Sequence, residues 1–229
     1  MNYHHYCKTG AFHEGSGTAC QDAYYTAENA SYALVAIADG VSACKHGREG
    51  ARAVTAAIWD YIESEGENVF LFAPPKLAYL LTEHILYHLE LTAWQLQTSL
   101  RELASTAAFV CIEKKSGKAV IGSLGDSLAF GSVGGSHAAI FVPKAPTLTP
   151  HTTVSPDAHK KLQLAYRTLS YGDTILLGTD GFLHALRTLG SESLQFERAV
   201  LTFDFSDLDS QLSEFPEPDD CTYAAVQHI

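Results

Sequence analysis

The stretch Leu34-Val35-Ala36-Ile37-Ala38-Asp39-Gly40 is an apolar run that ends in an acidic residue and a glycine. Short apolar runs bounded by turn residues are typical of buried strands, so residues 32–38 are predicted to form one. The pattern returns at Ile175-Leu176-Leu177-Gly178-Thr179-Asp180-Gly181, where we expect a strand over 173–179. Asp39 and Asp180 therefore each stand at the end of a predicted buried strand.

Two more acidic positions lie beside predicted strands. Asp126 follows the apolar segment that starts at Ile121, and Asp219-Asp220 precedes the last apolar run, 221–227. Carboxylates that end several buried strands are expected to converge at one end of a sheet, where they cannot all stay ionised without cations. Oxygen ligands favour the hard ions Mg²⁺ and Mn²⁺, and pairs of such ions are usual in phosphoryl hydrolysis.

Composition and charge exclude several classes of protein. The chain has 229 residues, of which 46% are hydrophobic, so we expect a single domain over 1–229 with a substantial core. No apolar stretch is long enough to cross a bilayer, and the first residues lack the apolar centre of a signal peptide, so a cytoplasmic protein without membrane contact is expected. The net charge of -11 argues against a nucleic-acid partner.

Acidic residues outside the motifs, in 204–209 and 214–217, are expected on a solvated surface. The five cysteines have no CxxC spacing, which fits a reduced compartment and argues against zinc or disulfides. Cys20, Cys44 and Cys221 stand beside the acidic motifs, where both apolar packing and sensitivity to oxidation are open interpretations.

The remaining periodicity predicts an α+β protein. Apolar residues at helical spacing over 51–62 indicate a helix after Gly40, and Pro74 opens a second helical stretch to about Leu103, as one long helix or two. Further predictions are strands at 106–112, 118–123, 128–133, 138–142 and 221–227, helices at 156–166 and 182–189, and a loop over 143–153. This order indicates antiparallel strands with helices outside them.

From about Gly10 to Val226 the ordered motifs resemble those of the metal-dependent serine/threonine protein phosphatases, the type 2C family. The motifs are Cys20-Gln21-Asp22-Ala23-Tyr24, Ala38-Asp39-Gly40 with 47–51, Ser105-Thr106-Ala107, Gly125-Asp126-Ser127, 172–181 and Asp219-Asp220-Cys221-Thr222. The resemblance implies a four-layer αββα sandwich, in which two antiparallel sheets pack face to face with helix pairs on both outer faces.

The resemblance also implies roles for single residues. Asp39 would bridge two Mg²⁺ or Mn²⁺ ions, with the Gly40 carbonyl, Asp180 and Asp219 as further ligands. Asp22 would bind an ion directly or support a ligand, Asp126 would serve a third ion, and Asp220 could hold a bound water. A hydroxide shared by the two ions would attack phosphoserine or phosphothreonine in a protein substrate, for which a cognate serine/threonine kinase could be a partner. A small phosphorylated metabolite stays open as an alternative substrate.

Two departures from the family pattern concern substrate binding. Gly17 stands where many members carry a phosphate-binding Arg, as in a bacterial subgroup that lacks it, and Val41 stands where some members carry a proton-donating His. Phosphate binding would then come from the ions or from basic side chains near the Asp39 motif, namely Lys45, Arg48 and Arg52. His46 could donate the proton, but a polar residue at a helix start is the favoured interpretation, and a metal-bound water is the default donor. Any flap over the site is expected to be small.

Two other functions are compatible with parts of the sequence. Gly125-Asp126-Ser127-Leu128 spells the signature of a serine esterase family with Ser127 as nucleophile, but it lies mid-chain and no Asp-x-x-His follows near the end. A catalytically inactive descendant of the phosphatases, acting as a binding or regulatory module, is favoured by the missing Arg. The intact set of aspartates argues against it.

Overall fold

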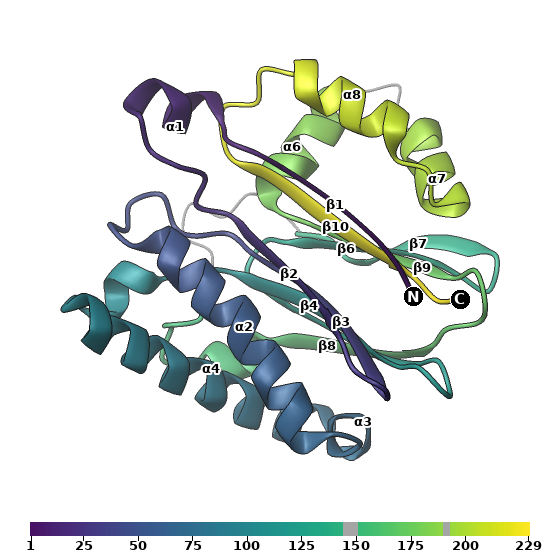
Figure 1. Ribbon diagram of the computed structural model, residues 1–229, viewed down its shortest axis with the longest axis horizontal. Coiled ribbons are helices and arrows are strands. Elements are labelled where there is room, and N and C mark those ends of the chain that lie inside the picture. Colours follow the sequence, from purple (N-terminus) through teal and green to yellow (C-terminus); the bar gives the residue numbers. More distant parts are fainter. Residues whose placement is uncertain (144–150, 190–192) are drawn as a thin grey trace.

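The computed structural model describes residues 1–143, 151–189 and 193–229. The described residues form two five-stranded antiparallel sheets, in the orders β1-β10-β9-β6-β7 and β2-β3-β4-β5-β8. Figure 1 shows the two sheets face to face, with α2 and α4 outside one of them and α6, α7 and α8 outside the other. The predicted α+β sandwich is therefore confirmed.

Each element has the following bounds. The first sheet contains β1 (Asn2–Lys8), β10 (Cys221–Gln227), β9 (Thr174–Gly178), β6 (Leu128–Val133) and β7 (Ser136–Phe141). The second contains β2 (Ala23–Glu28), β3 (Tyr32–Ala38), β4 (Ala107–Glu113), β5 (Lys118–Leu124) and β8 (Gln163–Thr168). The helices are α1 (Ala11–Ser16), α2 (Gly47–Glu65), α3 (Asn68–Leu71), α4 (Pro74–Leu96), the 3₁₀ helix η1 (Leu100–Leu103), α5 (Ala158–Lys161), α6 (Asp180–Leu189), α7 (Ser193–Thr202) and α8 (Ser206–Glu214).

The long apolar run of β3 is explained by burial on both faces. Side chains alternate along a strand. Val35 and Ile37 therefore pack between the two sheets, whereas Leu34 and Ala36 pack under the helices α2 and α4. On the opposite side of the molecule, α6 to α8 cover the first sheet through a separate apolar cluster that includes Tyr223.

Comparison with the predicted elements shows both agreement and error. Strands β3 and β10 have the predicted bounds, and the second helical stretch ends at Leu96, where Gln97 adopts a left-handed conformation. The predicted helix over 156–166 is wrong, because only α5 is helical and β8 follows it. In β8, Leu164 and Tyr166 are two residues apart and pack under the helices, so the segment obeys strand periodicity. Most of the predicted loop 143–153, where a flap would lie, falls outside the described residues.

The register of the strands determines where the acidic motifs meet. Gly178 at the end of β9 pairs with Leu128 at the start of β6 and with Tyr223 near the start of β10. In the other sheet, Ala38 at the end of β3 pairs with Ala23 at the start of β2. The segments that carry the predicted ligands therefore leave both sheets at the same end. Across the described parts of the chain, none of the helices has the length and apolarity that a membrane span requires.

Candidate metal centre

The aspartates predicted from the sequence meet at this end of the sandwich. Carboxylate oxygens of Asp39, Asp126 and Asp180 all lie within 4.8 Å of one another. Asp22 and Asp219 are also close to Asp39, since repulsion from both raises the pKa of Asp39. We call these five residues the carboxylate cluster. It joins both sheets, because Asp22 and Asp39 flank β2 and β3 whereas Asp180 and Asp219 flank β9 and β10.

Burial and mutual repulsion perturb the cluster strongly. Burial, with repulsion from Asp22, Asp180 and Asp219, raises the pKa of Asp39 well above its usual range. The same two causes raise the pKa of Asp180 to about 6, and burial raises the pKa of Asp22 and of Asp126. Metal-free protein therefore disfavours full ionisation of the cluster at neutral pH, and cations would relieve the repulsion.

The ligand atoms that the cluster offers are those that a hard cation prefers. Thr179 Oγ1 donates a hydrogen bond of 3.1 Å to Asp22 Oδ2, while Asp22 Oδ1 is buried and has no hydrogen-bond partner among the described residues. A buried oxygen without a partner is costly unless a donor, water or ion satisfies it. The acidic side chains offer oxygen alone, which suits Mg²⁺ or Mn²⁺.

Glycines let the backbone close around these side chains. A side chain at Gly40 would place its Cβ 2.4 Å from the Gly47 carbonyl carbon, and one at Gly181 would lie 2.1 Å from the Asp220 carbonyl oxygen. Both glycines follow a cluster aspartate, so the close approach keeps Asp39 against the start of α2 and Asp180 against the Asp219-Asp220 segment.

Comparison with known proteins identifies the family. The family model described as protein phosphatase 2C matches residues 9–215. The chain belongs to the protein phosphatase 2C family. No curated protein matches the sequence.

Solved structures of the phosphatase 2C fold resemble this one over nearly its whole length. A bacterial serine phosphatase is 17% identical, covers 100% of this chain and 98% of its own, and has a TM-score of 0.72. PppA, a key regulatory component of T6SS in Pseudomonas aeruginosa, is 17% identical, with 100% and 97% coverage and a TM-score of 0.69. RsbX in complex with magnesium is 14% identical, with 98% and 94% coverage and a TM-score of 0.63. At these identities the likeness shows the fold alone.

In this member of the phosphatase 2C family, Asp220 has a structural task. Its Oδ1 accepts a hydrogen bond of 2.8 Å from the Gly10 amide, and its Oδ2 accepts one of 2.6 Å from the Gln21 amide. His13 Nδ1 lies 2.9 Å from the same Oδ2. Asp220 thereby ties α1 and the segment before Asp22 to β10, and both of its oxygens are engaged by the protein.

A buried glutamate beside the cluster was missed by the sequence analysis. Glu217 was expected on a solvated surface, and this is wrong, because only 3% of it is exposed. Its two carboxylate oxygens each lie 2.9 Å from His184 Nδ1. The imidazole of His184 is thus oriented at the wall of a pocket of about 300 Å³ that Asp126, Asp180 and Asp219 also line.

The described lining of the pocket at the carboxylate cluster does not include the basic residues predicted from the sequence, Lys45, Arg48 and Arg52. Lys45 and Arg52 are exposed, and Lys45 lines a separate pocket beside His13. The described lining of the pocket at the carboxylate cluster contains Arg187 of α6 instead. A neighbouring pocket, which shares Asp126, is lined by Lys160 and Lys161 among others. Lys160 and Lys161 had no sequence signal, because only the fold brings α5 to the cluster, whereas Arg187 lies about two turns after Asp180 in the same helix.

His46 and Ser127, the candidate proton donor and the candidate nucleophile, contact other protein side chains. His46 precedes α2, and its Nδ1 lies 3.7 Å from Glu49 Oε2. Ser127 is buried, and its Oγ lies 3.4 Å from Thr106 Oγ1. Membership of the phosphatase 2C family removes the esterase interpretation of Ser127.

The cysteines near the cluster differ in reactivity. The thiols of Cys7 and Cys20 lie 3.5 Å apart, and their hydrogen bond lowers the pKa of Cys7 to about 7. Burial raises the pKa of Cys44 and of Cys221. The thiol best suited to oxidation is therefore the exposed Cys7, which the sequence did not single out.

Proposed function

We propose that the protein is a metal-dependent phosphomonoester hydrolase that removes phosphate from phosphoserine and phosphothreonine in proteins. The observation that carries the proposal is the meeting of Asp39, Asp126 and Asp180 within 4.8 Å in a chain of the phosphatase 2C family. Two Mg²⁺ or Mn²⁺ ions would be held by Asp39, Asp180, Asp219 and the Gly40 carbonyl, with Asp22 beside them and Asp126 available to a third. When bound, such ions supply a hydroxide nucleophile and neutralise the phosphate oxygens.

The protein itself orients the ligands. Asp180 Oδ1 accepts a hydrogen bond of 2.7 Å from the Gly181 amide, and Asp219 Oδ1 accepts one of 2.9 Å from the Asp220 amide. Thr179 holds one oxygen of Asp22 and leaves the other free. Carboxylates fixed in this way need little reorganisation when ions bind, which favours the preorganised electrostatics on which phosphoryl transfer depends.

For substrate binding we propose Arg187 rather than Lys45, Arg48 or Arg52. Arg187 shares the pocket with Asp126, Asp180 and Asp219, and a guanidinium can donate two parallel hydrogen bonds to a phosphate. Lys160 and Lys161 in the adjoining pocket would attract an acidic or multiply phosphorylated peptide. A serine/threonine kinase acting on the same substrate would be the functional partner.

For protonation of the leaving alkoxide we propose His184. It lines the same pocket, and the buried Glu217 accepts a hydrogen bond from its Nδ1, which leaves Nε2 for the substrate. His46 instead lies beside Glu49 at the start of α2. A water bound to an ion is the alternative proton donor.

The proposal is tested by phosphate release from a phosphothreonine peptide and from an aryl phosphate, in chelator, Mg²⁺ and Mn²⁺. We expect turnover that requires a divalent ion and is lost in Asp39→Asn. The matched control is Asp60→Asn, which removes a carboxylate of α2 away from the pocket. A folded wild type that releases no phosphate with either ion would favour the alternative, an inactive binding or regulatory module, which the absence of an Arg at Gly17 suggests.

A further inference from the structure

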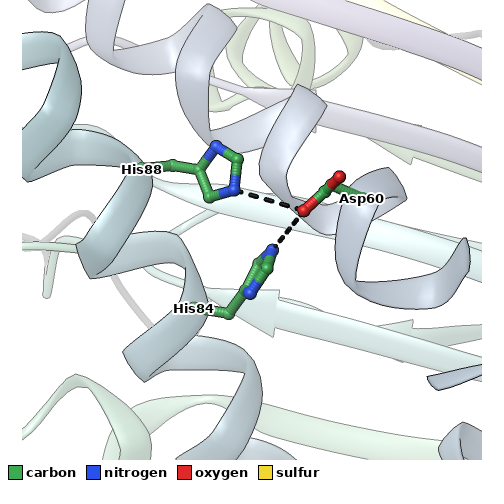
Figure 2. Close-up of side chains that lie close together, drawn as sticks. All are labelled: Asp60, His84 and His88. Atoms are coloured by element: carbon green, nitrogen blue, oxygen red, sulfur yellow. Dashed lines mark hydrogen bonds and ion pairs between the residues drawn. The ribbon is translucent and has the colours of Figure 1, made fainter. Parts of the chain in front are cut away.

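A second group of ligand-type side chains lies on the outer helical layer. Asp60 extends from α2, and His84 and His88 extend from α4 (Figure 2). The two histidines are four residues apart, so they project from the same face of α4 one turn from each other. Figure 2 shows both imidazole rings turned toward the carboxylate of Asp60. We call these three residues the histidine cluster.

The distances in the histidine cluster are close to those of a metal site. His84 Nε2 lies 2.9 Å from Asp60 Oδ2, and His88 Nε2 lies 3.3 Å from the same oxygen. The potential ligand atoms of all three residues lie within 4.8 Å of one another. In a tetrahedral zinc site, bonds of about 2.0–2.2 Å separate two ligand atoms by roughly 3.3 Å. Only small side-chain movements are needed to admit an ion.

Neighbouring rings hold the imidazoles in place. The rings of His84 and His88 are 4.7 Å apart, and Tyr61 packs on His84 at 5.4 Å. The side chains of Asp60, His84 and His88 remain 59%, 24% and 30% exposed, so an ion can enter from solvent and retain water. A water molecule would complete a four-coordinate site with two imidazoles and one carboxylate.

We propose that Asp60, His84 and His88 form a binding site for Zn²⁺ that links α2 to α4. Imidazole ligands select Zn²⁺, Ni²⁺ or Cu²⁺ over Mg²⁺ and Mn²⁺, which prefer oxygen. The site is therefore chemically distinct from the carboxylate cluster, and it does not depend on phosphatase activity. On binding, each Nε2 must be free of its proton, so the hydrogen bond between His84 and Asp60 and the close contact of His88 with Asp60 are replaced by bonds to the ion.

The test is Zn²⁺ titration of the full chain by calorimetry in excess Mg²⁺, which occupies oxygen sites but competes weakly for imidazole. We expect one equivalent to bind to wild type, with at least a tenfold loss of affinity in His84→Gln and in His88→Gln and no detectable binding in the double variant. His159→Gln, a histidine that contacts α4 through Tyr79, serves as the control and should bind as wild type does.

Thermal unfolding supplies an independent readout. A hundredfold excess of Zn²⁺ over its Kd should raise the Tm of wild type by roughly 5 °C and leave the double variant unchanged. The Tm values without zinc establish that the variants are folded. Absence of Zn²⁺ binding to wild type, or equal binding to the double variant, would overturn the proposal.

Discussion

The carboxylate cluster and the histidine cluster are built on different supports. Asp39 directly follows β3 and Asp180 lies two residues after β9, and each of these buried strands is paired on both sides. Asp60, His84 and His88 instead stand on two helices of the outer layer. The first cluster offers oxygen ligands, of which Asp22 and Asp126 are buried and the other three half-buried, and the second offers imidazoles that are also half-buried beside an exposed carboxylate.

The two ligand sets differ in their effect on the stability of the metal-free protein. Burial and repulsion raise the pKa of Asp39, so the carboxylate cluster is destabilising until cations bind. In the histidine cluster, His84 Nε2 already forms a hydrogen bond to Asp60 and His88 Nε2 lies 3.3 Å from the same carboxylate, so the metal-free state carries no such repulsion. We therefore expect the carboxylate cluster to need bound ions to relieve its repulsion, whereas the histidine cluster is stable without an ion and is stabilised further by one.

The largest expected effect separates the clusters by activity. Asp39→Asn should lower kcat on a phosphothreonine peptide by about 1000-fold, since electrostatic stabilisation at the reacting phosphate is lost. His84→Gln should stay within about twofold of wild type, because it lies in the outer layer. Steady-state kinetics in Mn²⁺ measure both, and a similar loss in the two variants would erase the distinction between the clusters.

The second prediction concerns the pocket wall. Arg187→Ala should raise the KM for the peptide by about tenfold, because a charge-assisted hydrogen bond to phosphate is worth about 1.5 kcal/mol or more. Arg52→Ala, which removes an exposed guanidinium of α2, is the matched control and should change KM little. If Arg52→Ala has the larger effect, Arg187 is not the residue that binds the phosphate.

The third prediction uses pH on the metal-free protein. The pKa of Asp180 is raised to about 6 in the folded state, so folded protein binds its proton more tightly than unfolded protein does. This stabilising protonation is present at low pH and is lost as the pH rises from about 4 to 6. In chelator, the unfolding free energy of wild type should fall by about 1 kcal/mol more than that of Asp180→Asn between pH 5 and pH 7.

Urea unfolding of both proteins at the two pH values measures this difference. Mn²⁺ should abolish it, because the ion occupies the carboxylates. Identical pH dependence of the two metal-free proteins would show that Asp180 titrates normally.

The smallest expected effect lies in the outer layer. Asp60→Asn without zinc should cost no more than about 0.5 kcal/mol, since partly exposed pairs are screened by solvent. The corresponding loss in the buried Asp220→Asn should be larger, because Gly10, Gln21 and His13 all depend on that carboxylate. The Tm values of the two variants test this ranking. A larger loss of Tm in Asp60→Asn than in Asp220→Asn would show that the packing of α2 on α4 depends on Asp60.

Much of the carboxylate cluster could be predicted because its residues are tied to strands. The apolar runs of β3 and β10 are buried on both faces, so their bounds could be read from composition, and the acidic residues beside them had to meet at one end. The sandwich itself came from the resemblance to the family. Segments without a buried run were harder to predict, as in β8, where no residue is fully buried.

The histidine cluster and the Glu217–His184 pair could not be predicted from sequence patterns. The spacing of His84 and His88 is local, but their meeting with Asp60 depends on how α2 packs on α4. Glu217 stands between two prolines in an acidic segment that resembles a surface loop, and contacts with distant segments bury it, namely the pairing with His184 and the hydrogen bond from the Ala11 amide to its backbone oxygen. Both features arise from tertiary contacts between segments far apart in the chain.

The most direct test of the central claim is a Mn²⁺ titration that follows thermal unfolding and phosphate release from a phosphothreonine peptide in the same protein preparation. We predict that stabilisation and turnover rise over the same range of Mn²⁺ concentration, and that Asp39→Asn loses both. Stabilisation of wild type by Mn²⁺ without any phosphate release would contradict the account and show that the carboxylate cluster binds ions in a protein that does not catalyse hydrolysis.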